Sequence, residues 1–85
     1  MEKETLFKKI LSIVGTQRHD IEFININKIS NTNYILLMKV RNLESNLVEW
    51  IVCYYNQFYK LHNTHYFKNE IKAHSRYSYI LMKDN

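Results

Sequence analysis

The N-terminal segment alternates apolar and charged positions with the period of an amphipathic helix. Its apolar residues, which fall on one side of such a helix, are Leu6, Phe7, Ile10, Leu11 and Val14. Gly15 follows the last of them, where glycine commonly adopts the left-handed conformation that ends a helix. The pattern therefore predicts an N-terminal helix that ends at Gly15.

Three apolar segments with the period of a β-strand come next. Residues 21–29 are rich in β-branched side chains, residues 34–41 place Tyr34 and Val40 on one face, and residues 47–54 centre on Trp50. Two short polar clusters separate these segments, and Asn and Ser side chains favour turns because they bond back to their own backbone. The pattern predicts an antiparallel meander of three strands.

From residue 55 the period changes to that of a helix. Apolar and aromatic side chains fall on one side of it, namely Tyr55, Phe58, Tyr59, His62 and Tyr66. Residues 67–76 can continue or restart this helix, while residues 77–82 fit either a final strand or a helix end. If the third strand runs directly into the helix, Trp50 and Phe58 are both expected to be buried.

The predicted fold class is therefore α+β, in a single small domain that spans residues 1–85. An N-terminal helix precedes a three-stranded antiparallel meander, and a C-terminal helix or helices follow it. An apolar fraction of 46% with 14% aromatics is too high for a disordered chain.

Composition and charge narrow the compartment and the partners. Cys53 is the only cysteine, so no internal disulfide is possible and a reducing, cytoplasmic location is expected. No apolar run approaches the roughly 20 residues of a membrane-spanning helix. Residues 57–85 hold five Lys and Arg against two Asp and Glu. This excess indicates an anionic partner, a phospholipid surface or a nucleic acid, or else it only keeps the protein soluble.

Few residues suggest chemistry. Lys68, Lys72 and Arg76 recur every four residues and would form one basic stripe on a helix, which either contacts anionic lipids or is simply a solvated face. His62 and His65 have the spacing of metal ligands, but further ligands at helpful spacing are missing. We therefore expect no metal, no cofactor and no enzymatic activity.

One stretch resembles a known family. Its residues Trp50, Val52, Tyr55, Phe58, Leu61 and His62 are similar in spacing to the strand-to-helix junction of the phox-homology (PX) domain, a phosphoinositide-binding module. The resemblance extends over about residues 21–67 and implies a helix that starts at Tyr55. It also implies that Tyr54 stands where the family has a phosphate-binding basic residue. Tyr55 occupies the position that packs under the inositol ring in the family, and the alternative for it is an aromatic side chain that fills the core between strand and helix. The headgroup site is accordingly expected to be degenerate.

The resemblance implies a non-catalytic, sorting nexin-like module in membrane trafficking. It would associate with phosphoinositide membranes or dock to a trafficking protein, as a cytoplasmic protein that is peripheral on endosomal membranes. The candidate lipid-binding residues are Tyr54, Tyr55, Lys60, Lys68, Lys72 and Arg76. The alternative is a small basic nucleic-acid-binding or inhibitor protein of a mobile element, because double-stranded RNA-binding domains share the order helix, three strands, helix.

Overall fold

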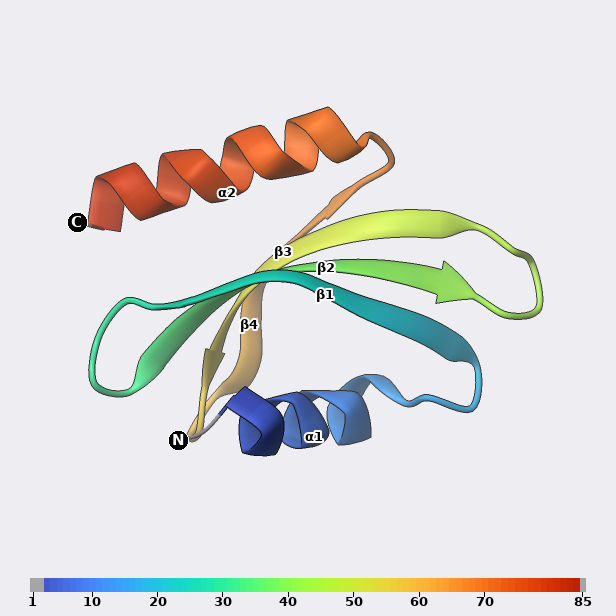
Figure 1. Cartoon of the computed structure of the whole chain (residues 1–85), viewed down its shortest axis with the longest axis horizontal. Helices are drawn as coiled ribbons and strands as arrows, with labels where there is room; N and C mark the ends of the chain where they lie inside the picture. Colours follow the sequence, from blue (N-terminus) through green and yellow to red (C-terminus); the bar gives the residue numbers. More distant parts are fainter. Residues whose placement is uncertain (1–2, 85) are drawn as a thin grey trace.

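Two helices lie on opposite sides of one four-stranded sheet in the computed structural model, which describes residues 3–84 (Figure 1). The elements follow the order α1 (Lys3–Val14), β1 (His19–Lys28), β2 (Asn33–Asn42), β3 (Val48–Asn56), β4 (Lys60–Phe67) and α2 (Glu70–Asp84). Each strand pairs antiparallel with the next, so the order in the sheet is β1-β2-β3-β4.

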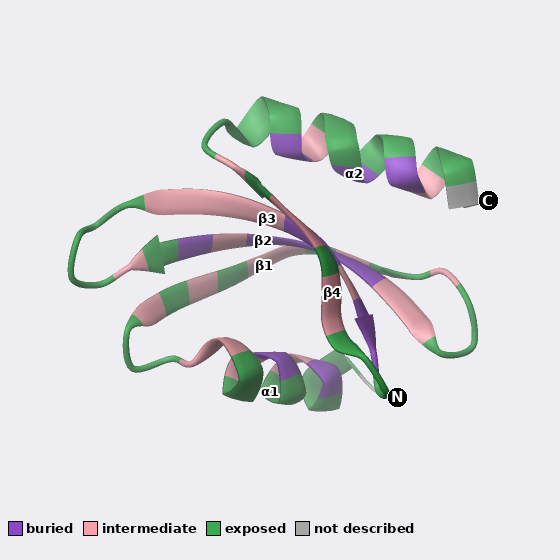
Figure 2. Cartoon of the chain, turned by 180° about the vertical axis from the view of Figure 1, so that it is seen from behind, coloured by how far each residue is buried: buried purple, intermediate pink, exposed green. Residues whose placement is uncertain are grey.

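The core is divided into two parts by β2, which is buried on both of its faces. Leu36 and Met38 pack toward α1, whereas Ile35 and Leu37 pack toward α2. All four side chains are at most 1% exposed, and Figure 2 shows the buried stretch in the middle of this strand. A strand covered on both faces is apolar at consecutive positions rather than at alternate ones, which explains the uninterrupted run of apolar residues.

The first helix confirms the expectation from its periodicity. Leu6 and Ile10 are fully buried against the sheet, and the ring of Phe7 stacks on Phe23 of β1 with centroids 4.3 Å apart. Gly15 has a φ of 89°, and its amide donates to the carbonyl of Leu11 at 2.9 Å. This is the left-handed helix end predicted for that glycine.

The second helix is continuous and settles the open alternative for residues 77–82. Asn69 precedes it, and the Oδ1 atom of Asn69 accepts a hydrogen bond from the amide of Lys72 at 3.1 Å, as a helix cap does. Ala73, Tyr77 and Ile80 are buried against the sheet. Burial raises the pKa of Tyr77 to about 12, so the phenol stays protonated and donates to Oδ1 of Asn27 on β1 at 2.5 Å.

The predicted three-stranded sheet is wrong, because a fourth strand occupies the place of the helix expected from Tyr55. Tyr55 and Asn56 are the last residues of β3. Oδ1 of Asn56 then accepts from the amide of Phe58 at 2.7 Å, and Nδ2 of Asn56 donates to Oδ1 of Asn33 at 2.7 Å. Lys60 completes the turn with a φ of 58°. The helical junction implied by the phox-homology resemblance is therefore not found in the described residues.

A bulge in β4 explains why the segment has a helix-like pattern. His62 pairs with Tyr54 and His65 pairs with Val52, and the register shifts between the two pairs. Tyr54 and Val52 point to the same side of the sheet, so His62 and His65 also share one face although they are three residues apart. An extra residue in a strand interrupts the period of two, and here it produces the spacing of a helix.

The expected burial of Phe58 is also wrong. Phe58 lies in the turn between β3 and β4 with 71% of its surface exposed, while Trp50 is half-buried and packs at the edge of the core under α2. The two aromatic residues therefore do not form a shared core. The fully buried side chains of β2 take that role instead.

Shortening a side chain on either face of β2 is expected to destabilise the protein strongly. Leu36→Ala and Leu37→Ala should each lower the free energy of unfolding by about 2–5 kcal/mol, because each leaves a cavity under one helix. Phe58→Ala should change it by no more than about 0.5 kcal/mol, since its ring is exposed. Urea unfolding followed by circular dichroism measures all three. A Phe58→Ala protein as unstable as the two leucine variants would contradict the exposed turn.

Candidate functional site

The six predicted lipid-binding residues do not form one site. Tyr55 faces α1 and is 1% exposed within the core, whereas the neighbouring Tyr54 faces α2 and is half-buried. Lys60 is exposed in the turn before β4. Successive residues of a strand point to opposite faces, so the two tyrosines cannot contact the same ligand in the way the resemblance implies.

The predicted basic stripe is only partly helical. Lys68 lies in the connection before α2, while Lys72 and Arg76 are exposed on the helix. Of the six predicted residues, Tyr54 and Arg76 alone line a common hollow. The sequence therefore identified single members of a site without the residues that complete it.

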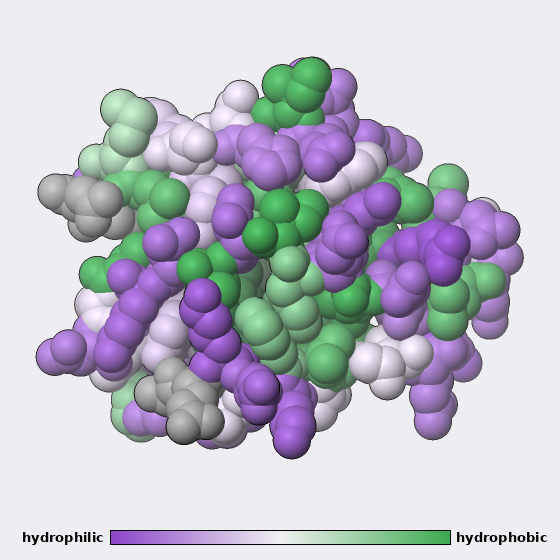
Figure 3. Space-filling model, viewed as in Figure 1, coloured by the Kyte–Doolittle hydropathy of each residue, from purple (hydrophilic) through white to green (hydrophobic). Residues whose placement is uncertain are grey.

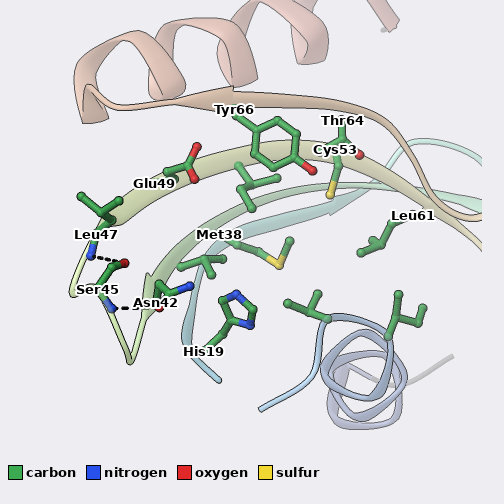
Figure 4. Close-up of a pocket in the computed structure, with 14 residues that line it drawn as sticks. His19, Met38, Asn42, Ser45, Leu47, Glu49, Cys53, Leu61, Thr64 and Tyr66 are labelled. Atoms are coloured by element: carbon green, nitrogen blue, oxygen red, sulfur yellow. Dashed lines mark hydrogen bonds between the residues drawn. The ribbon is translucent and has the colours of Figure 1, made fainter. Parts of the chain in front are cut away.

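The best-formed concavity is a groove on the opposite face of the sheet, between α1 and β2–β4. Its volume is about 470 Å³, within the range of ligand-binding clefts. Its lining is mainly apolar: Met38 and Val40 come from β2, Ile51 and Cys53 from β3, and Val14 from the end of α1. Figure 4 shows the sulfur-bearing side chains of Met38 and Cys53 directed into this space.

Large apolar side chains continue from the groove onto the outer surface. Leu47 is 66% exposed, Tyr66 is 64% exposed and Ile13 is 44% exposed, and all three line the groove. They come from the β2–β3 loop, β4 and α1 respectively. In the space-filling view of Figure 3, hydrophobic residues likewise reach the surface in patches between hydrophilic ones. Exposed apolar side chains around a concavity are typical of a docking surface.

A hydrogen-bonded loop holds Leu47 at the mouth of the groove. Oδ1 of Asn42 accepts from the amides of Glu44 and Ser45 at 2.9 and 3.1 Å, and Oγ of Ser45 accepts from the amide of Leu47 at 3.3 Å. Asn46 takes a φ of 61°, which brings the chain back into β3. The exposure of Leu47 is thus a consequence of a defined turn.

The polar side chains that line the groove include Glu49, His19 and Cys53, which differ in their partners and protonation. Glu49 on β3 makes no hydrogen bond or ion pair with the described residues, and Nδ1 of His19 is buried without a hydrogen-bond partner among them. Burial raises the pKa of the Cys53 thiol from 9.0 to about 12, so the thiol is protonated at neutral pH. Cys53 therefore contributes apolar surface rather than a nucleophile.

A second, smaller hollow lies on the α2 side of the sheet. Its volume is about 280 Å³, and it is formed between α2 and the bulged part of β4. Arg76, Tyr79 and Lys83 line it from the helix, and Thr64 and His65 line it from the strand. This hollow, hereafter the α2–β4 hollow, is the one that Tyr54 also borders.

Sequence reasoning missed the groove. Two of its rim residues gave little indication of it in the sequence. Leu47 is a single apolar residue next to a polar loop, and the periodicity placed Tyr66 on the face of a helix. Among the described residues, no group of three or more metal-ligating side chains is found, and no helix is long and apolar enough to cross a membrane.

Comparison with known proteins returned no match, because no family model, curated protein or solved structure is significantly similar to this chain.

The thiol of Cys53 is expected to be nearly unreactive in the folded protein. At pH 8 its raised pKa leaves a thiolate fraction on the order of 0.0001, so labelling by a thiol reagent should be slower by a factor of roughly 1,000 than for an exposed cysteine. The matched control is Cys53→Ala combined with Ser75→Cys, which moves the thiol to an exposed position of α2. Labelling rates within about tenfold of each other would contradict the burial of Cys53.

Proposed function

We propose that the protein is a non-catalytic docking module whose groove receives an apolar segment of a partner protein. The observation that carries this proposal is the ring of exposed apolar side chains, Ile13, Leu47 and Tyr66, around an apolar groove of about 470 Å³. Burying apolar surface contributes roughly 25 cal/mol per Å². A partner that covers these three exposed side chains would therefore gain binding free energy from apolar burial alone, and no catalytic group is needed.

A protein segment accounts for the rim better than a small molecule does. A small ligand would fill the floor formed by Met38 and Ile51, yet it would leave Leu47 and Tyr66 in water. A peptide segment spans both, because its backbone carries side chains to the floor and to the rim at once.

The charge of the groove defines the partner further. Glu49 is the only acidic residue that lines it, and this carboxylate has no partner among residues 3–83. A carboxylate half-buried beside apolar residues favours a ligand that brings a cation or a hydrogen-bond donor. The expected occupant is therefore an apolar segment that carries one Lys or Arg.

Two other functions have less support. A phox-homology type of headgroup site needs Tyr54 and Tyr55 at one ligand, and they lie on opposite faces of the sheet. The nucleic-acid alternative was based on the order helix, three strands, helix, and a fourth strand replaces that order.

Selection from a random peptide library tests the proposal. We expect enriched peptides to combine apolar residues with one basic residue, and Leu47→Ser and Tyr66→Ser each to weaken their binding roughly tenfold, about 1.4 kcal/mol. Fluorescence polarisation with a labelled peptide measures the affinity. Phe58→Ser is the matched control, since it removes an aromatic residue that is equally exposed but lies outside the groove.

A charge reversal makes the test more specific. Glu49→Lys should disfavour the basic peptides, whereas Glu22→Lys, the same change at an exposed position that does not line the groove, should leave their binding unchanged. Loss of binding in the Phe58 or Glu22 control would refute the groove as the docking site. Self-association or vesicle binding that disappears in Tyr66→Ser would assign the groove to a second copy or to a membrane, and the proposal would be wrong.

A further inference from the structure

The α2–β4 hollow combines positive charge with hydrogen-bond donors on the face of the sheet opposite to the groove. Arg76, Tyr79 and Lys83 line it at helix positions i, i+3 and i+7, a spacing that places them on one side of α2. The two cationic residues are about 10 Å apart along the helix axis, and both carry long side chains. They can therefore reach one anion between them.

Among the side chains of residues 3–83, no acidic group neutralises the positive charge of this hollow. No Asp or Glu lines it, and neither Arg76 nor Lys83 forms an ion pair with the side chains of residues 3–83. The guanidinium of Arg76 lies over the ring of Tyr79, with 5.7 Å from Cζ to the ring centroid. Such a contact orients the guanidinium but leaves its charge and its paired donors available.

The strand side of the hollow adds neutral donors. The β4 bulge lies here: Asn63 has a φ of 50°, and the pairing with β3 shifts register at this point. A bulge leaves an extra residue without a partner on the neighbouring strand, and here Asn63 and Thr64 are not paired with a residue of β3. The hydroxyl of Thr64 and the imidazole of His65 also line the hollow and can donate hydrogen bonds.

We propose that the α2–β4 hollow binds a phosphomonoester group. Two cations and several neutral donors match the two negative charges and the three terminal oxygens of such a group better than they match a carboxylate. The volume of about 280 Å³ also accommodates part of the group that carries the phosphate, and the rings of Tyr54 and Tyr79 border that space. This site goes beyond docking in the groove, because Thr64 is the one residue that lines both the hollow and the groove.

Nuclear magnetic resonance titration of the full chain with inorganic phosphate and with an inositol monophosphate tests this site. We expect saturable shifts of the amides of residues 63–65 and 76–83, and weaker binding of acetate. Arg76→Gln and Lys83→Gln should each reduce the affinity roughly tenfold or more, because each removes a charge-assisted hydrogen bond. Both positions are exposed, so the variants are expected to fold.

Lys72→Gln is the matched control, since it removes the same charge from an exposed position of α2 that does not line the hollow. It should leave the affinity unchanged. Equal weakening by Lys72→Gln would show that only net charge attracts the anion, and an absence of saturable shifts would show that there is no site. Either result would overturn the proposal.

Vesicles then identify the source of the phosphate. Co-sedimentation with phosphatidylcholine vesicles that contain phosphatidylinositol monophosphate, lost in Arg76→Gln, assigns the site to a lipid headgroup. Binding of the soluble ester without co-sedimentation assigns it to a free phosphate ester.

Discussion

The burial of β2 on both faces is the constraint on which the rest of the structure depends. Ile35 and Leu37 require a cover on one side, and Leu36 and Met38 require one on the other. Burying four such side chains contributes on the order of 10 kcal/mol, comparable with the whole stability of a small domain. Neither helix can therefore be lost without exposing a row of apolar residues, and a two-layer arrangement is excluded for this sequence.

The two concavities have different origins, a helix shorter than the strands it covers on one face of the sheet and a strand bulge on the other. α1 has 12 residues and is thus about 18 Å long, whereas β2 has 10 residues and extends for about 33 Å. α1 consequently covers only part of its face, and the uncovered part beside β3 and β4 is the groove. On the other face α2 packs over β2, β3 and β4, and the bulge of β4 leaves the hollow beside the helix.

The sequence predicted the elements whose pattern is regular. The amphipathic spacing around Leu6 and Ile10 and the glycine after it were sufficient for α1, and the first three strands were expected close to their observed positions. The fourth strand was missed because its turn lacks the usual residues. Lys60 takes the positive φ that glycine or asparagine commonly takes, and Asn56 is held by Asn33, a partner 23 residues away. Neither feature is visible in local periodicity.

The sites were harder to predict than the fold because they depend on which face each residue occupies. An error of one residue in the register moves every side chain of a strand to the other face of the sheet. A helix over residues 55–62 has no such alternation, so it does not assign these side chains to either face of the sheet. Once β3 is extended to Asn56, Cys53 belongs to the groove and Tyr54 to the hollow, although they are adjacent in the chain. The sheet thus separates the two sites by its own thickness. An apolar segment on one face and an anion on the other would lie on opposite sides of the sheet. Any coupling between them would pass through β3 and β4, the strands that line both sites, and Thr64 of β4 lines both.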